Sequence, residues 1–392
     1  MHVITIQRGK QMSDHRAVDA RTLQDYVNRR AILRAGLLGG VALGVAACGV
    51  SSSSTTSSVA SPAAAGALPE PSQELIEAAQ KEGEINVYYA APPDVGSVWL
   101  AAFTRKYGIT VNGTHAISST AEVTLAAQMA GGKPVADVFQ SSDSQWITGT
   151  AIPKGYFVAP DPAAVPAVKT WPASGILSGM GYLADVSLFT IQYNTNIVKP
   201  GEISTWNDVL NPKYKGLIIL IDPRDNVADL AFYQLQRQNW GDAWLEGLAK
   251  QEPQLTVTGT AAANVIAAGG AAILIPGNYF SVTSLLAAKA PIGDVTPPGK
   301  TSVTGVEQYL MLVKDAPHPN AAQLFMNYSL SAQGQSQICG SQLCTSMLNA
   351  PGTAALPRDY AHPPIDEAVS DEAEIVSLLG ISGKKATIGA SS

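Results

Sequence analysis

Residues Pro200 to Arg224 read PGEISTWNDVLNPKYKGLIILIDPR, and the rest of the chain is interpreted outward from this segment. Its first half carries apolar side chains at roughly helical spacing, at Trp206, Val209, Leu210 and Tyr214. That spacing predicts a short amphipathic helix, which Asn211-Pro212 ends because proline disfavours the α region in the residue before it. The second half, Leu217 to Ile221, is short, apolar and rich in β-branched residues, which predicts a strand buried on both faces.

Asp222-Pro223-Arg224 follows directly at the C-terminal end of that strand. In open α/β sheets this end is where ligands bind. Outward from here, short apolar strands alternate with helical patterns in both directions, which predicts parallel βαβ units. The predicted short strands are Ile85 to Ala90, Ile109 to Val111, Val135 to Phe139 and Ala271 to Ile275.

Two longer β-rich segments, Tyr182 to Asn194 and Thr304 to Lys314, stand apart from these short strands. The order of Trp206, the phrase NPKYKG at 211–216 and a strand ending in Asp-Pro resembles extracytoplasmic solute-binding proteins of ABC importers. The phrases APHPNAA at 316–322 and SAQGQSQ at 331–337 fit the same family. The nearest group is the ferric-iron-binding type, with relatives for thiamine, polyamines and phosphonates.

The resemblance implies an α/β, two-lobed type II periplasmic-binding-protein fold with a ligand cleft between lobes. The two long segments become the crossover strands that join the lobes. The domain boundaries expected are an export signal at 1–47, a tether at 48–69, lobe 1 at 70–185, lobe 2 at 186–303, a return to lobe 1 at 304–360, and a C-terminal helix and tail at 361–392. The helix, Ile365 to Leu379, is expected to pack on the surface or to fray.

The N-terminus is expected to be an export signal rather than part of the folded domains. Arg29-Arg30 precedes a short apolar run that ends in Val45-Ala46-Ala47-Cys48, which resembles a twin-arginine signal with a lipobox. The resemblance implies cleavage before Cys48 and lipidation of that residue, on the outer face of the bacterial cell membrane. The alternatives are export by the general route and an unmodified cysteine after an apolar helix. The Ser, Thr, Ala and Pro that follow predict a flexible tether.

Composition and motif content argue against several classes of function. With 392 residues, 46% of them hydrophobic, the chain can build two cores. The net charge of −6 argues against a nucleic-acid partner, which would select clustered Lys and Arg. The sequence has no Gly-x-Ser-x-Gly motif and only three histidines after the tether, so we expect no enzyme and no cofactor.

Arg224 is the predicted charge anchor of the ligand site, because a guanidinium binds carboxylate or phosphonate in a bidentate manner. Its alternative role is a salt bridge to Asp222, Asp225 or Asp229. Hydroxyl and backbone donors at helix N-termini are predicted to assist it. These are Ser119, Thr120 and Ser142, for which plain N-capping is the alternative. Ala91 is expected at the cleft end of the first strand, and Glu307 in the cleft or in the hinge.

A ferric site in the iron-binding relatives uses two adjacent tyrosines. The matching place here resembles Asn278-Tyr279-Phe280, in which Phe280 cannot ligate. We therefore expect no metal, with Tyr279 as the alternative ligand, and we assign Asn278 and Tyr279 to the solute site. Cys339 and Cys344 are expected to form a small-loop disulfide, with free thiols or a metal pair as alternatives.

The function expected is a monomeric, lipid-anchored binding protein that captures a small solute and delivers it to permease subunits in the membrane. The solute expected is an organic anion. The alternative within the class is ferric iron, and from other classes an anchored enzyme or a sensor.

Overall fold

The structure is a computed structural model that describes residues 70–91, 93–116, 118–297, 303–340 and 344–389. The predicted export signal at 1–47, Cys48 and the tether at 48–69 lie outside the described residues. Within the described part of the chain, no helix is long and apolar enough to cross a membrane.

A mixed sheet organises the described chain, with strand order β2-β1-β3-β11-β6-β9-β7-β8. Within the first lobe β1 runs parallel to β2 and β3, and within the second β7 runs parallel to β8 and β9, which confirms the predicted βαβ units. β10, β4 and β5 pair at the sides of this order. The strands are β1 (Glu84–Tyr89), β2 (Thr110–His115), β3 (Val138–Ser141), β4 (Phe157–Val158), β5 (Ile176–Leu177), β6 (Gly181–Asn194), β7 (Ile218–Ile221), β8 (Gln254–Thr256), β9 (Ile273–Asn278), β10 (Ile292–Val295) and β11 (Gly305–Val313).

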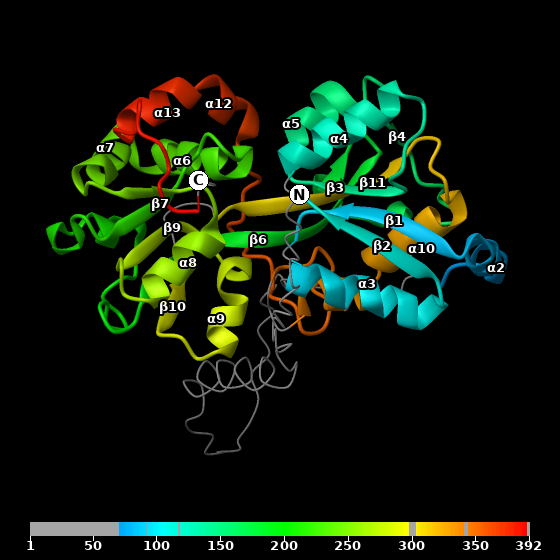
Figure 1. The fold of residues 1–392 in the computed structure, drawn as a ribbon, viewed down its shortest axis with the longest axis horizontal. Helices are drawn as coiled ribbons and strands as arrows, with labels where there is room; N and C mark the ends of the chain where they lie inside the picture. Colours follow the sequence, from blue (N-terminus) through cyan, green and yellow to red (C-terminus); the bar gives the residue numbers. More distant parts are fainter. Residues whose placement is uncertain (1–69, 92, 117, 298–302, 341–343, 390–392) are drawn as a thin grey trace, which may run out of the picture. The chain divides into compact units, whose positions relative to one another are not determined.

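β6 and β11 are the two long strands predicted as crossovers, and both lobes share them (Figure 1). β6 pairs with β11 between Tyr182 and Leu188, and with β9 between Phe189 and Tyr193. β11 in turn pairs with β3 of the first lobe. The two strands therefore carry the chain from one lobe to the other and back, which is the two-lobed architecture expected.

Two apolar clusters form the core of the first lobe, and each contains side chains from its sheet. In one of them Trp99 and Phe103 lie with their ring centroids 4.9 Å from that of Phe325. The helical elements of this lobe are α2 (Gln73–Glu82), α3 (Pro93–Tyr107), α4 (Ser118–Ala130), α5 (Ser144–Trp146), η1 (Ile147–Ala151), η2 (Pro166–Lys169), η3 (Ala173–Gly175), α10 (Pro319–Leu330) and α11 (Ala332–Ile338).

The stretch around Trp206 anchors the second lobe, although not as the single helix predicted. It forms two 3₁₀ turns, η4 (Trp206–Leu210) and η5 (Pro212–Tyr214), because Asn211-Pro212 interrupts it after one turn. Trp206 is buried, with its ring centroid 5.0 Å from that of Phe232, and its carbonyl accepts a hydrogen bond from Trp244. The buried apolar residues inferred from the sequence are therefore confirmed, but the segment forms two short 3₁₀ turns rather than one helix.

The remaining helices of the second lobe surround its strands. They are α6 (Val227–Trp240), α7 (Asp242–Lys250), α8 (Gly259–Ala267), η6 (Tyr279–Val282) and α9 (Thr283–Ala287).

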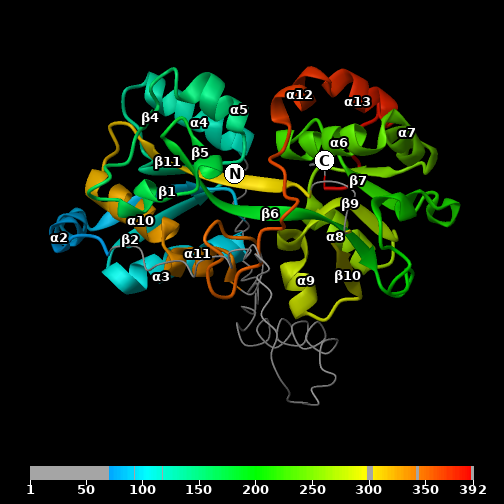
Figure 2. The ribbon, with the colours of Figure 1, turned by 180° about the vertical axis from the view of Figure 1, so that it is seen from behind.

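The C-terminal segment forms two helices, α12 (Ile365–Ser370) and α13 (Glu372–Leu378), that lie over α6 and α7 (Figure 2). Their buried apolar residues belong to the core of the second lobe, so this segment does not fray. Beyond them, the carbonyl of Ile388 accepts a hydrogen bond from the backbone of Val257. The described residues 365–388 are thus part of the second lobe's fold.

Candidate functional site

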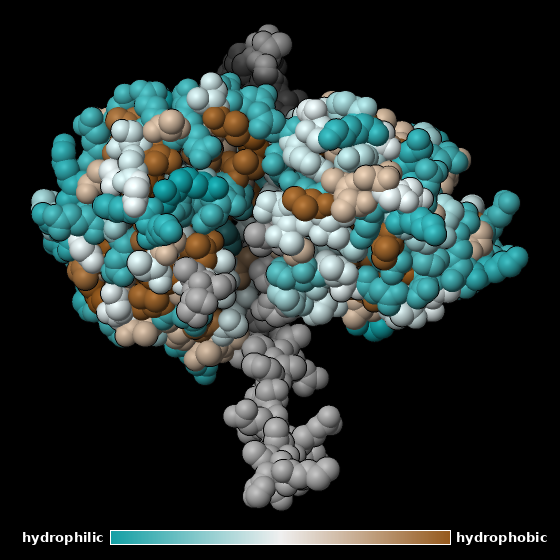
Figure 3. All heavy atoms as spheres, turned by 45° about the horizontal axis from the view of Figure 1, so that its top comes forward, coloured by the Kyte–Doolittle hydropathy of each residue, from teal (hydrophilic) through white to brown (hydrophobic). Residues whose placement is uncertain are grey.

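A cavity of about 290 Å³ lies where helices of both lobes begin. β3 ends at Ser141 and β7 at Ile221, so the cavity sits at the C-terminal ends of parallel strands, where α/β proteins bind ligands. Figure 3 shows the surface hollowed between the two lobes. The described lining residues are Ser118, Ser119, Asp143, Gln145, Pro223, Arg224, Asp225, Asn226, Val227, Leu230, Val369 and Glu372.

The first lobe contributes the start of α4 to the cavity. Ser118 and Ser119 line it, and the Ser118 hydroxyl accepts a hydrogen bond from the Ser142 backbone N–H at 3.1 Å. Ser142 itself is buried, with its hydroxyl 3.1 Å from that of Ser118. Thr120 is exposed, and its backbone carbonyl accepts from Thr124. Of the three predicted hydroxyl residues, the structure places Ser119 in the lining, Ser142 behind it and Thr120 outside.

A buried carboxyl group lies close to these serines. Glu122 on α4 is 6% exposed, and its Oε1 accepts a hydrogen bond from the Ser141 hydroxyl at 2.7 Å. Burial raises the pKa of Glu122 to about 7; the Ser141 hydrogen bond opposes this shift and the charge of Asp143 adds to it. The side chain therefore holds or releases a proton near neutral pH, beside the cavity.

Arg224 lines the cavity from the second lobe, but its guanidinium is already paired. Nε donates to Asp222 Oδ1 at 2.7 Å, and Nη2 donates to Asp222 Oδ2 at 2.5 Å. Nη2 also donates to the carbonyl of Lys384 at 2.8 Å. The hydrogen bond to Asp222 is the main cause of a raised Arg224 pKa. The salt bridge named as the alternative role of Arg224 is therefore formed, and its charge is shared with a carboxylate whose side chain is 5% exposed.

The acidic groups around Arg224 outnumber it. Of the described lining residues, Asp143, Asp225 and Glu372 are acidic and Arg224 alone is basic. Burial raises the pKa of Asp225, as does the charge of Asp222, while Arg224 lowers it. The cavity consequently presents an excess of carboxyl groups.

Asp229 lies in the first turn of α6, four residues after Asp225, and is 5% exposed. Burial raises its pKa to about 7, and the charge of Asp225 adds to the shift. Its Oδ1 has no hydrogen-bond partner within the described chain. A second proton-binding carboxyl thus lies close behind the acidic lining.

Other predicted site residues lie outside the described lining. Ala91 is buried in the core of the first lobe. Asn278 caps η6, with its Oδ1 accepting from the Ser281 backbone and hydroxyl, both at 3.1 Å. Tyr279 is half-buried at the start of η6, and Phe280 packs against the first lobe's core. Phe280 therefore forms an apolar contact between the lobes.

Glu307 lies on the crossover strand β11, and neighbouring side chains already occupy its carboxylate. Its carboxylate accepts hydrogen bonds from the hydroxyls of Tyr309 and Tyr360 and pairs with His362 Nδ1, each at 2.5 Å. Burial is the main cause of the raised pKa values of both tyrosines, and Glu307 adds to it, whereas the hydrogen bond to Glu307 is the main cause of the raised pKa of His362. Glu307 thus ties the 360–362 segment to β11, and its predicted roles, in the cleft or in the hinge, stay predictions.

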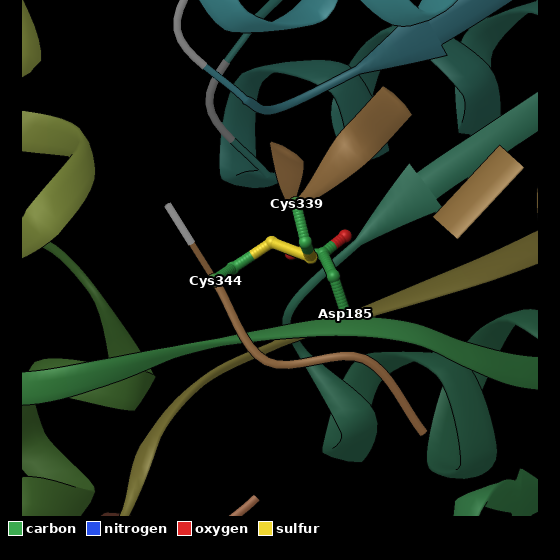
Figure 4. A group of neighbouring side chains, drawn as sticks. All are labelled: Asp185, Cys339 and Cys344. Atoms are coloured by element: carbon green, nitrogen blue, oxygen red, sulfur yellow. A yellow bond between two sulfur atoms is a disulfide. The ribbon is translucent and has the colours of Figure 1, made fainter. Parts of the chain in front are cut away.

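Cys339 and Cys344 form a disulfide with a Cα–Cα distance of 4.6 Å. Asp185 of β6 lies beside it, with its carboxyl group turned toward the sulfur atoms (Figure 4). Burial raises the pKa of Asp185 to about 8. No neighbouring sequence motif relates Asp185 to these cysteines, because 154 positions separate it from Cys339.

Sequence reasoning missed Asp143, Glu122 and the C-terminal residues Val369 and Glu372. Asp143 had a usable signal, since it directly follows the strand-end serines at 141–142. The C-terminal residues had none, because only the packing of α12 and α13 on α6 brings them to the cavity.

The family model described as bacterial extracellular solute-binding protein matches residues 85–338. Among solved structures, the substrate-binding protein of an ABC transporter from Agrobacterium tumefaciens is 14% identical, with a TM-score of 0.64 over 76% of this chain and 95% of that one. AfuA from Actinobacillus pleuropneumoniae with bound fructose-6-phosphate is 20% identical, with a TM-score of 0.58 over 76% and 97%. Iron-bound HitA from Pseudomonas aeruginosa is 19% identical, with a TM-score of 0.58 over 74% and 99%. These structures share the fold, and the family match covers most of the chain, so the protein belongs to the bacterial extracellular solute-binding proteins.

Proposed function

We propose that this chain is the solute-binding component of an ABC importer, which captures a small solute between its lobes and delivers it to permease subunits. The observation that carries the proposal is the cavity lined by side chains of both lobes at the strand ends. A solute held there contacts both lobes at once, so its binding stabilises a closed arrangement over an open one.

Closure requires a hinge, and the two shared strands β6 and β11 supply it. At their crossing, a Cβ on Gly305 would lie 2.5 Å from the carbonyl oxygen of Ser187. The two backbones therefore approach as closely as a glycine permits. Small-angle X-ray scattering should show a lower radius of gyration when the solute is added, and an unchanged radius at saturation would contradict closure.

The charge of the cavity favours a positively charged organic solute. Three acidic residues line it, and Asp222 already neutralises Arg224. A cationic solute gains from these carboxylates, whereas an anion must compete with Asp222 for the guanidinium. A bare metal ion is less suited, because in the described residues the carboxyls of the cavity form no group that converges at metal-ligand distance.

Isothermal titration calorimetry against spermidine, thiamine, small carboxylates, phosphonates and ferric citrate tests the solute class. We expect an organic cation to bind, and Asp225→Asn and Glu372→Gln each to weaken it about tenfold, or about 1.4 kcal/mol. Glu246→Gln, an exposed acid on α7, is the matched control and should change nothing. Binding confined to organic anions, and lost in Arg224→Gln, would instead establish the organic anion anchored by Arg224.

The lipid anchor on Cys48 and export to the outer face of the membrane belong to the same proposal. A tethered binding protein stays near its permease, which raises its effective concentration there. The full chain should fractionate with membranes, and Cys48→Ser should release it into the soluble exported fraction. Equal partition of both forms would contradict the anchor. We further propose that the protein works as a monomer and without catalytic turnover of its solute, which sedimentation and product analysis would test.

A further inference from the structure

Asp185 is a buried acidic residue to which solute capture gives no role. It lies on β6 opposite Gln308 of β11, and its side chain is 1% exposed. Neither of its carboxyl oxygens has a hydrogen-bond partner within the described chain. Buried polar groups are nearly always satisfied, so a carboxyl with both oxygens unpaired calls for a ligand or a second state of its surroundings.

The group that Asp185 faces is the Cys339–Cys344 disulfide (Figure 4). One carboxyl oxygen and the two sulfur atoms all lie within 4.8 Å of one another. In a tetrahedral zinc site, Zn–S and Zn–O bond lengths place sulfur and oxygen about 3.6 Å apart. Each sulfur–oxygen separation therefore needs to shorten by at most about 1.2 Å, while the two sulfur atoms, once their bond is broken, must separate to about 3.8 Å to share one ion.

The backbone holds these donors in place from two sides. The residue after Cys344, Thr345, exchanges two hydrogen bonds with Val186, the residue after Asp185, at 3.1 and 2.9 Å. Cys339 follows α11 and is fully buried. The carboxylate and both sulfurs thus belong to elements already fixed to each other, and this arrangement lies outside the described lining of the solute cavity.

We propose that Cys339, Cys344 and Asp185 form a binding site for a thiophilic d¹⁰ cation of the Zn²⁺ class, which the disulfide closes and reduction opens. Two thiolates and one carboxylate are zinc ligands, and three protein ligands leave a fourth position for water. In the oxidised form each sulfur is bonded to the other, and neither is a thiolate.

The conversion balances in electrons and protons. A dithiol reductant gives two electrons and two protons to the Cys339–Cys344 bond, which becomes two thiols while the reductant becomes its own disulfide. Zn²⁺ then displaces the proton of each thiol, and that of Asp185 where the carboxyl is protonated. After release of the ion, a disulfide oxidant restores the Cys339–Cys344 bond by taking the two electrons and two protons of the thiols and becoming a dithiol itself.

The test uses the full chain carrying Cys48→Ser, so that the third cysteine of the sequence does not contribute. The protein is reduced with a phosphine under argon and titrated with Co²⁺ as the spectroscopic probe, followed by competition with Zn²⁺. We expect thiolate-to-cobalt charge-transfer bands that saturate at one equivalent, and no bands with the oxidised protein. Absence of one-equivalent binding to the reduced protein would overturn the proposal.

Two variants at position 185 test whether the carboxylate contributes to binding of the ion. Asp185→Asn keeps the shape of the side chain and should bind Co²⁺ at least tenfold more weakly, whereas Asp185→Glu should retain charge-transfer bands. Equal affinity of Asp185→Asn and the parent would overturn the role of Asp185. If Asp185→Asn does not fold, protection of Cys339 and Cys344 by Zn²⁺ against alkylation in the reduced parent decides instead: protection supports the site, and unhindered alkylation refutes it.

Discussion

Arg224 forms a salt bridge with Asp222 and also lines the cavity, and the substitution Asp222→Asn separates these two roles. Asn keeps an oxygen for the Arg224 backbone N–H, which Asp222 Oδ1 accepts at 3.1 Å, but it removes the charge and one side-chain acceptor. Hydrogen bonds to charged groups contribute about 1.5–3 kcal/mol each. Because the Arg224 side chain is 30% exposed, we expect the lower end, a loss of about 1–2 kcal/mol in the free energy of unfolding.

The same substitution should change solute selectivity, because it frees the guanidinium and removes one negative charge near the cavity. We expect affinity for an organic cation to fall and weak affinity for carboxylates or phosphonates to appear. Urea unfolding measures the first effect and calorimetry the second, with Glu246→Gln as control. An unfolding free energy and a solute preference both equal to those of the parent would refute the view that Asp222 holds Arg224 away from the solute.

Three further predictions concern the folded state. The pKa values of Glu122 and Asp229, both raised to about 7, mean that the folded protein keeps protons that the unfolded chain loses above about pH 4, so stability should fall as pH rises from 4 to 7. Thermal melting at both pH values checks this, and Glu122→Gln should flatten the slope; a rise in melting temperature toward pH 7 would contradict it. Trp206→Ala should cost about 3–5 kcal/mol in urea unfolding, since it empties a buried aromatic site; a cost below 1 kcal/mol would show that the site is not close-packed. Gly305→Ala should cost about 1–3 kcal/mol, because its Cβ would meet the Ser187 carbonyl at 2.5 Å; unchanged stability and unchanged closure in scattering would remove Gly305 from the hinge.

Local patterns predicted the fold well because its elements are encoded locally. The buried strand Ile218–Ile221 and the crossover strand Gly181–Asn194 follow from short runs of apolar and β-branched residues. The error at Trp206 is of the same local kind. Apolar spacing identified the buried face, but it does not distinguish a helix from two 3₁₀ turns when a proline follows so closely.

The charge of the site was less predictable, since it depends on residues that lie far apart in the sequence. Arg224 was placed correctly at the cavity, yet its chemistry depends on the side-chain orientation of Asp222, which no pattern specifies. Asp143 and Glu372 are 229 positions apart and meet only in the fold. The excess of carboxyl groups in the lining results from that meeting, whereas the prediction of an organic anion, which stays a prediction, rested on Arg224 alone.

The packing of the C-terminal helices α12 and α13 on the second lobe affects both the fold and the composition of the site. Their acidic composition favours an exposed, frayed tail, but Ile365, Ile375 and Leu379 are buried in the second lobe's core. The segment also contacts the first lobe, where the Gln145 amide donates to Asp366 at 3.3 Å. Glu372 then becomes part of the cavity. The segment therefore packs as part of the second lobe, and we expect any opening of the lobes to break its contact with Gln145.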